Sequence, residues 1–591
     1  RSKVINQSGK EDIFKWRCCL VAYQNMTAPT AYGKVDEAEN ARLVARRSSR
    51  KRIAIIAVSS IVLVAIVVGA VVGTSDRGSS SSSSEKSSSI STSIKAVCDV
   101  TLYKEACFSS LTPRANPKQN QPEDLFRLSI QVAREAVANA SGYFAAQSAA
   151  FRNANNNVTL QALDDCQELV GLANDQLNQS LSSAGKSLSS NLEDFRSWIS
   201  TAATCLETCM DGLDAANASD KVQNYLINST ETTSNSLAII TWIQNMTSSI
   251  SFSGRRLMSD GMPHWLGRSD RQLLSNADLK KRANFIVAKD GTGKFSTISD
   301  ALDAVSDKST VRQVIYVKEG IYTEYVTVNK TKWNVVIVGD GKNRTIVTGN
   351  KNVVDGSTTF NSATFAVFGQ GFMARDIGFR NTAGAIKQQA VALMSSADLT
   401  AFYRCSMDAF QDTLYVHSGR QFYRECDIIG TVDFIFGNSA VVLQNCTILP
   451  RQPLKGQQTT ITAQGKFDPN QNTGISIHNS TILPYDNLTG VETYLGRPWK
   501  NYSTTIFMRS SLGSLIDPRG WLPWGNAPTP DTIFYAEFQN TGPGANTSRR
   551  VNWPGLKLNL TAKQAAKFTV RQFIQGKQWI PPLRIPFTNN L

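Results

Sequence analysis

A period of about 20 residues in the second half of the chain constrains the fold more than any other feature. Cys405, Cys426 and Cys446 follow one another at intervals of 21 and 20 residues. The letters FYRC that end at the first of these cysteines recur as FYREC at the second, and NCTILP around the third recurs later as NSTILP. Short β-rich segments and turn residues fill the intervals, which is typical of a parallel β-helix, whereas an antiparallel sandwich would make the repeats coincidental. We therefore predict an all-β, right-handed parallel β-helix over residues 275–591.

The same period predicts which side chains stack on one another. Residues one period apart lie on adjacent coils, about 4.8 Å from each other. Asp412 and Asp433 are 21 residues apart, and aromatic and aliphatic residues flank both. Two carboxylates held side by side cannot both ionise freely, so the pKa of one rises and an acid stands next to a base. The pair is therefore our candidate for general acid/base chemistry.

The N-terminal part indicates the compartment. Residues 53–73 are apolar, uncharged and long enough to span a bilayer as a helix. They follow a dense basic run, which places residues 1–52 in the cytosol and the rest of the chain in the secretory lumen. Since the segment is long for a cleaved signal peptide, we predict a transmembrane signal anchor, followed by a flexible Ser-rich linker at 74–94. The first methionine is Met26, so we interpret residues 1–25 as upstream sequence or a fragment artefact.

Residues 95–250 have a helical pattern. Four segments, which begin LFRLSIQ, TLQALDD, LEDFRSW and VQNYLIN, carry apolar residues at three- and four-residue spacing. Short polar links join them, which predicts an antiparallel four-helix bundle.

Residues 251–274 break this pattern and separate the two domains. They contain two basic tetrads that suit processing proteases in an exposed linker, although an ordinary polar linker has a similar composition. The tetrads are Arg255-Arg256-Leu257-Met258 and Arg271-Gln272-Leu273-Leu274.

Most cysteines and many Asn-X-Ser/Thr sequons follow the predicted anchor, which fits disulfide formation and glycosylation in the secretory lumen. Several pairings are compatible with the spacing, and the sequence alone does not choose between them. The candidates are Cys98 with Cys107, Cys166 with Cys205 or Cys209, and Cys426 with Cys446 or Cys405.

The charge of the chain and its motifs exclude several functions. Residues 275–591 hold 34 Lys and Arg against 22 Asp and Glu, a net charge of +12. Such a charge attracts nucleic acid, anionic membrane or acidic polysaccharide, but no nucleic-acid-binding motif is present, so we expect no nucleic-acid partner. No Cys/His cluster has metal-ligand spacing, and we expect neither a metal nor a cofactor. A Gly-x-Ser-x-Gly motif is missing, so a serine triad with His417 or His478 is a weak alternative.

Five phrases, in family order, carry a resemblance to plant pectin methylesterases over about residues 284–579. They are GIYTE at 320–324, QAVAL at 389–393, QDTL at 411–414, DFIFG at 433–437 and LGRPW at 495–499. The helical region resembles the inhibitor domain that precedes the catalytic domain in one subgroup. The resemblance implies hydrolysis of methyl esters in polygalacturonate, with a pro-region that silences the enzyme until the linker is cut. It also favours the disulfides Cys98–Cys107 and Cys166–Cys209.

The resemblance also implies a role for each matching residue. Asp433 is expected to attack the ester carbonyl, and Arg497 to hold it ionised. Asp412 is expected to protonate the departing methanol and then deprotonate water, while Gln411 and Gln389 donate hydrogen bonds to the oxyanion. The residues expected to contact the substrate are Thr359, Gln389, Phe410, Tyr415, Phe434, Arg497 and Trp499. Each also has a structural interpretation, such as an ion pair, core packing or an interior polar ladder.

The expected partners follow from this interpretation. They are methyl-esterified pectin, the chain's own pro-region or separate inhibitor proteins, a processing protease and, before cleavage, the membrane. The expected route is the secretory pathway and then the cell wall, and the basic charge favours blockwise demethylation of a polyanion. The alternatives are a pectin lyase, a polygalacturonase or a non-catalytic wall-binding protein, which release of methanol without chain shortening would exclude.

Overall fold

The computed structural model describes residues 84–591, with gaps at 117–120, 152–156, 185–187, 189–190, 217–222 and 251–278. Ser83–Leu591 forms one compact unit. The predicted cytosolic tail, the anchor at 53–73 and both processing tetrads lie outside the described residues. Within the described part, no helix is long and apolar enough to cross a membrane.

The first described region is a helical bundle, as predicted. Its four long helices are α4 (Pro122–Phe151), α5 (Asn157–Ser183), α6 (Leu192–Ala215) and α7 (Gln223–Ile250). Their apolar stripes meet in one core that includes Phe126, Leu169, Phe195 and Leu206, all almost fully buried. A disulfide between Cys166 and Cys209 joins α5 to α6, so the choice of Cys209 over Cys205 is confirmed.

The bundle begins earlier than expected. Helix α2 (Ser84–Cys98) covers most of the segment that we predicted as a flexible linker, so that prediction is wrong from Ser84 onward. Ile90, Ile94 and Val97 recur at helical spacing and are buried in the core of the bundle, which outweighs the low helix propensity of the serines. A short hairpin leads to α3 (Lys104–Leu111) and η1 (Thr112–Arg114), and the predicted disulfide Cys98–Cys107 closes it.

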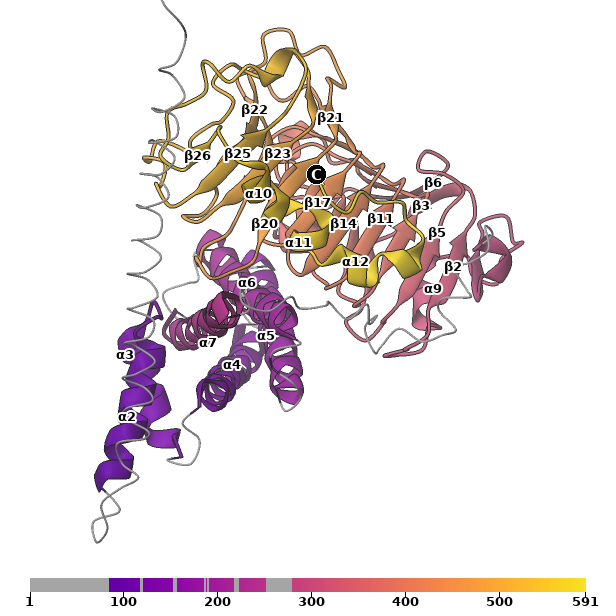
Figure 1. Cartoon of the computed structure of the whole chain (residues 1–591). Helices are drawn as coiled ribbons and strands as arrows, with labels where there is room; N and C mark the ends of the chain where they lie inside the picture. Colours follow the sequence, from indigo (N-terminus) through magenta and orange to yellow (C-terminus); the bar gives the residue numbers. More distant parts are fainter. Residues whose placement is uncertain are drawn as a thin grey trace, which may run out of the picture. The chain divides into compact units, whose positions relative to one another are not determined.

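Residues 279–591 wind through three parallel sheets, and Figure 1 shows their strands stacked coil upon coil. One sheet runs β1 (Phe285–Val287), β2 (Gln313–Val317), β5 (Val335–Val338), β8 (Met373–Arg375), β11 (Thr400–Tyr403), β14 (Arg420–Arg424), β17 (Ala440–Gln444), β20 (Gly474–His478), β23 (Thr504–Met508), β25 (Phe534–Phe538) and β26 (Leu556–Lys557). A second runs β3 (Gly320–Thr323), β6 (Thr345–Gly349), β9 (Gly378–Asn381), β12 (Ser406–Asp408), β15 (Asp427–Gly430), β18 (Thr447–Pro450), β21 (Thr481–Ile482) and β24 (Ser511–Leu512). The third runs β4 (Val326–Val328), β7 (Phe365–Val367), β10 (Leu393–Ser395), β13 (Leu414–Val416), β16 (Ile435–Gly437), β19 (Thr459–Gln464) and β22 (Thr493–Gly496).

The register of these strands confirms the predicted parallel coil. In the third sheet Leu393 pairs with Leu414, which pairs with Ile435, so each step along the sheet is one 21-residue period. All strand pairs in residues 279–591 are parallel, which excludes the antiparallel sandwich. The main interior core draws only on residues of this region, from Val287 to Tyr535, so the β-helix has a core of its own.

The sequence repeats arise from one kind of bend. Each coil passes from the first sheet to the second through a residue with left-handed backbone, and Arg404 (φ 53°), Glu425 (φ 55°) and Asn445 (φ 54°) are three of these residues. The residue after each bend points into the core, and at three successive coils that residue is a buried cysteine. The cysteine ladder therefore marks the bend of the coil.

The predicted Cys426–Cys446 disulfide is wrong, because both cysteines are free and buried. Side chains at matching positions of adjacent parallel strands point the same way. Their Cβ atoms therefore stay about 4.8 Å apart, whereas a disulfide brings them to about 3.8 Å. The alternative partner, Cys405, is free as well, for the same reason.

Short helices close the ends of the coil and cover part of one sheet. They are η5 (Lys280–Arg282), α9 (Ile298–Asp303), η6 (Phe360–Ser362), η7 (Ala385–Lys387), η8 (Pro543–Ala545), α10 (Ala562–Ala565), η9 (Ala566–Phe568), α11 (Val570–Phe573), α12 (Gly576–Trp579) and η10 (Pro581–Leu583). Trp579, Ile580 and Leu583 pack with Val336 and Phe422 in a core on the outer face of the first sheet.

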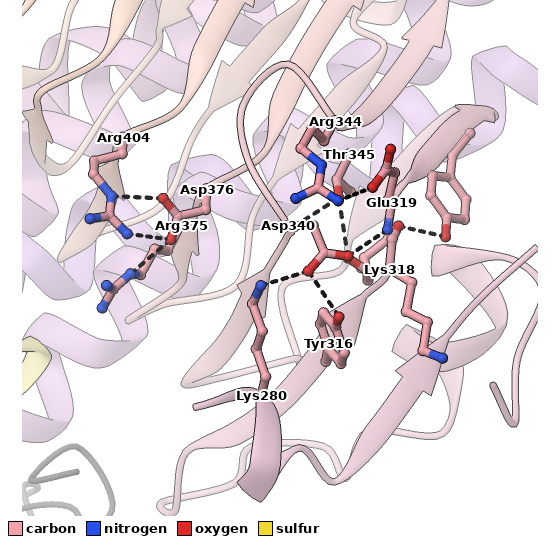
Figure 2. A network of polar contacts seen from close by, with 12 residues as sticks. Lys280, Tyr316, Lys318, Glu319, Asp340, Arg344, Thr345, Arg375, Asp376 and Arg404 are labelled. Atoms are coloured by element: carbon pink, nitrogen blue, oxygen red, sulfur yellow. Dashed lines mark hydrogen bonds and ion pairs between the residues drawn. The ribbon is translucent and has the colours of Figure 1, made fainter. Parts of the chain in front are cut away.

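Polar contacts hold the chain where it enters the β-helix (Figure 2). The Lys280 ammonium lies 2.6 Å from Oδ1 of Asp340, which also accepts a hydrogen bond from the Tyr316 hydroxyl at 2.9 Å. One coil further, Asp376 accepts two hydrogen bonds from Arg404. The first described residues after the linker are therefore attached to the β-helix.

Candidate active site

Two buried aspartates lie on adjacent coils of the third sheet, as the period predicts. Asp412 precedes β13 by one residue and Asp433 precedes β16 by one residue, and Leu414 pairs with Ile435 between these strands. The backbone N–H of Asp412 donates to the carbonyl of Val432 at 3.1 Å, which brings the two aspartates alongside each other. Both have left-handed backbone, with φ of 64° and 52°, a conformation that Asp tolerates better than most residues.

Asp433 is held by a fork of charge-assisted hydrogen bonds. Nη2 of Arg497, which follows β22, lies 2.6 Å from Oδ2, and Nε lies 2.9 Å from Oδ1. The Thr460 hydroxyl donates to Oδ1 at 2.6 Å and accepts from the Asp433 N–H at 2.8 Å. This arrangement fixes the orientation of the carboxylate and favours its ionised form.

Asp412 has the opposite electrostatic environment. Burial raises the pKa of its carboxyl well above the ordinary value, and the negative charge of Asp433 raises it further, against a smaller lowering by Arg497. Asp412 therefore carries a proton under conditions in which an exposed carboxyl has lost it. An acid and an ionised carboxylate stand next to each other.

Two glutamines flank the pair on adjacent coils. Gln389 and Gln411 form a parallel backbone bridge, and the N–H of Ala390 donates to the Gln411 carbonyl at 3.2 Å. Both side chains line the same cavity as the aspartates. In the described part of the chain, Oε1 of Gln389 is buried without a hydrogen-bond partner.

The cavity above the aspartates has a volume of about 450 Å³ and a largely aromatic wall. The rings of Tyr415 and Phe436 stack at 4.1 Å between centroids, and Trp499 lies next to Trp524 at 6.4 Å. The Arg497 guanidinium lies 4.4 Å from the centre of the Trp524 ring. Apolar walls around a few polar groups are typical of a site that binds an organic substrate.

The comparisons with known proteins agree with this geometry. Residues 284–577 match the pectinesterase family, and residues 92–239 match the plant invertase/pectin methylesterase inhibitor family. The chain is 53% identical to "Probable pectinesterase/pectinesterase inhibitor 46" of Arabidopsis thaliana, over 95% of this chain and 100% of that protein. It is 48% identical to "Pectinesterase 3" of Phaseolus vulgaris, over 85% of this chain and 87% of that protein.

The chain belongs to the plant pectinesterases that carry an N-terminal inhibitor domain. The solved structure of pectin methylesterase from carrot is similar, with 53% identity and a TM-score of 0.52, and the match covers 52% of this chain and 98% of the carrot chain. The protein is thus a carboxylic-ester hydrolase that acts on pectin.

Most of the expected site residues of this pectinesterase line the cavity, and some others do as well. Thr359, Tyr415 and Trp499 are among the lining residues, as expected. Trp524 also lines the cavity, and Thr460 contacts Asp433, but neither was predicted. Thr460 follows Asp433 by 27 residues, which is longer than the regular period, so the spacing contained no signal for this contact.

Two predicted substrate contacts are wrong. Phe434 is fully buried in the interior core, because the left-handed turn at Asp433 directs the next side chain inward, where Gly430 leaves room for it. Phe410 is half-buried outside the cavity, with the Arg451 guanidinium 3.9 Å from its ring centre.

The serine-triad alternative finds no support in the pectinesterase structure. His417 lies between two hydroxyls, with Ser396 at 2.8 Å from Nδ1 and Thr208 at 2.9 Å from Nε2. Burial lowers the pKa of His417 to about 3, which makes it a poor general base. Nδ1 of His478 contacts Gln444. In the described residues no group of three His, Cys, Asp or Glu side chains is arranged to hold a metal ion.

Side chains of the inhibitor domain reach the same cavity. Asp165 on α5 accepts a hydrogen bond from the Thr358 hydroxyl at 2.5 Å, and also one from Asn361. Glu207 and Asp211 on α6 pair with Lys500. Asp165 and Asp211 line the cavity together with the catalytic candidates. The helices thus close part of the space above the aspartates.

Proposed function

We propose that this pectinesterase uses Asp433 as a nucleophile and Asp412 as the acid and base. The Asp433 carboxylate attacks the ester carbonyl carbon of a galacturonate unit, and the bond from that carbon to the methoxy oxygen breaks. Asp412 gives its proton to the departing methanol. Water then attacks the acyl carbon of the resulting anhydride, Asp412 takes a proton from the water, and Asp433 leaves as a carboxylate.

The contrast between the two carboxylates carries this proposal. Asp433 is held by Arg497 and Thr460 in a geometry that suits an ionised nucleophile. Asp412 has no such partner, and its raised pKa suits a proton donor. Two coupled carboxyl groups with different environments are a common way to assign acid and base in one site.

The amides of Gln411 and Gln389 are proposed to donate hydrogen bonds to the oxygen that becomes negative in each tetrahedral intermediate. Loss of one such donor typically costs roughly 3–4 kcal/mol of transition-state stabilisation. Tyr415, Trp499 and Thr359 are proposed to contact the sugar, since they line the cavity beside the aspartates.

The experiment is methanol release from esterified pectin by Asp433→Asn. We expect a loss of about a thousandfold or more in kcat, with pectin chain length unchanged in wild type. Asp408→Asn is a matched control, because Asp408 is a carboxylate of the neighbouring second sheet that pairs with Arg380 and Arg451 outside the cavity. Activity that survives in Asp433→Asn would refute the nucleophile.

The inhibitor domain is proposed to silence the enzyme in the uncut chain. Its helices α5 and α6 supply Asp165, Thr208 and Asp211 to the cavity, where they take space that a polysaccharide needs. Separate inhibitor proteins of the same class would compete for the same surface.

The remaining parts of the prediction are proposals as well. A right-handed winding is supported by the strong preference of parallel crossovers for that hand. We also propose the signal anchor at 53–73, cleavage of the linker at 251–274 by a processing protease, a final location in the cell wall, and blockwise demethylation driven by the charge of +12.

A further inference from the structure

Lys500 differs from the other cations around the active site in the origin of its partners. Its ammonium lies 2.8 Å from Oε1 of Glu207 and 2.6 Å from Oδ1 of Asp211, both on α6 of the inhibitor domain. No ion pair within the described residues joins Lys500 to a carboxylate of the β-helix. Arg497 has its own partner, Asp433, on the β-helix.

The surroundings of Lys500 are those of a binding site. It directly follows Trp499, with the ammonium 5.7 Å from the centre of that ring. Its side chain is 21% exposed even though the helices cover it, so it is not an ordinary solvated surface lysine. Burial by itself lowers the pKa of Lys500, but Asp211 and Glu207 outweigh this and raise it. The cation is thus positioned to receive carboxylates from outside the β-helix.

The inhibitor domain presents its two carboxylates as a pair. Glu207 and Asp211 are one helical turn apart on α6, so they face Lys500 from the same side of the helix. Thr208, between them, lies 2.9 Å from His417 on the cavity side. Two carboxylates on a neighbouring segment resemble the product of this enzyme, a polymer with free carboxylates along its length.

We propose that Lys500 binds a free galacturonate carboxylate of the pectin chain next to the unit that is being hydrolysed, and that Glu207 and Asp211 imitate this carboxylate in the uncut chain. The inference rests on the proposed role of the cavity as the substrate cleft. Lys500 then favours pectin that is already partly de-esterified, and it gives successive hydrolysis of neighbouring units a specific contact.

The test compares substrates on the separated β-helix domain. A protease site is inserted in the linker, and the chain is cut and separated from its inhibitor domain. The β-helix has its own interior core, and the similar carrot structure spans 52% of this chain, which supports its folding alone. KM and kcat are then measured on fully esterified and on partly de-esterified pectin.

We expect Lys500→Met to raise KM on partly de-esterified pectin by about five- to tenfold, as loss of one partly exposed ion pair predicts. The rise on fully esterified pectin should be clearly smaller, and Lys500→Arg should restore the preference. Lys330→Met is the matched control. Lys330 pairs with Asp175 of the inhibitor domain in the same way, but it is half exposed and does not line the cavity.

An equal rise in KM on both substrates, or no rise on either, would overturn the proposal. Equal effects of Lys500→Met and Lys330→Met would overturn it as well. Melting temperatures check that each variant is folded, and Lys500→Gln replaces the methionine variant if that one is not. Because the readout is a difference in KM between substrates, it can fail while Asp433→Asn still abolishes methanol release, so the two proposals are tested separately.

Discussion

The β-helix and the helical bundle bring functional residues together in different ways. In the β-helix, Asp412 and Asp433 are neighbours because each coil repeats the path of the last. In the bundle, Asp165 and Asp211 come from helices α5 and α6, and they reach the cavity because the bundle docks on the β-helix. The first kind of proximity is written in the spacing of the sequence, and the second is not.

The difference also separates chemistry from control. All side chains that we assign to the reaction belong to residues 359–499 of the β-helix, while the bundle adds side chains that cover the cavity. If this division holds, changes in the bundle should alter access of substrate, and changes in the β-helix should alter the rate of reaction. The predictions below test this division.

The largest effect is expected from separating the two regions. Cutting the full chain at a protease site in the linker, followed by dilution, should raise methanol release by about a hundredfold or more, because a tethered inhibitor gains about that factor from its high local concentration. The uncut chain treated with the same protease, but without the inserted site, is the control. Equal activity before and after the cut would show that the bundle does not inhibit.

A smaller effect is expected within the β-helix at Thr460. Thr460→Val removes a hydrogen bond to the charged Asp433, so kcat should fall by roughly ten- to a hundredfold on the cut enzyme, in line with about 1.5–3 kcal/mol for such a bond. Thr459→Val is the control, because in the described structure the buried Thr459 hydroxyl has no hydrogen-bond partner. Similar losses in the two variants would show that the effect comes from packing of β19 and not from Asp433.

The smallest effect concerns pH and the contact between the regions. Burial raises the pKa of Asp165 from 3.8 to about 7. A carboxyl with a higher pKa in the docked state binds a proton on docking, so its contribution is fully present below about pH 4 and is lost as the pH rises to about 7. The inhibited fraction should therefore fall severalfold from about pH 5 to about pH 7, more steeply in wild type than in Asp165→Asn.

The titration of Asp412 also changes activity with pH, so each value must be divided by that of the cut enzyme at the same pH. Asp175→Asn is a suitable control, since Asp175 makes a half-exposed ion pair with Lys330 at the same contact. If Asp165→Asn retains the full pH dependence, another group controls it.

Much of the β-helix could be predicted because its physics is periodic. The 21-residue step from Leu393 to Leu414 to Ile435 is the register of the sheet itself. The same spacing misled us about Cys426 and Cys446, because it predicts which residues stack but not how their side chains are directed. The aromatic residue next to Asp433 is a similar case, since the backbone turn directs Phe434 inward.

The sequence by itself determined the parallel coil, the helical bundle and the closeness of Asp412 to Asp433, because apolar periodicity and a constant repeat length act along the chain. The tertiary structure alone decided the partners of those residues. Thr460 joins Asp433 across a coil of irregular length, and Glu207 and Asp211 meet Lys500 nearly 300 positions away in the sequence. Such contacts depend on how surfaces of different regions fit together, and no local spacing encodes that fit.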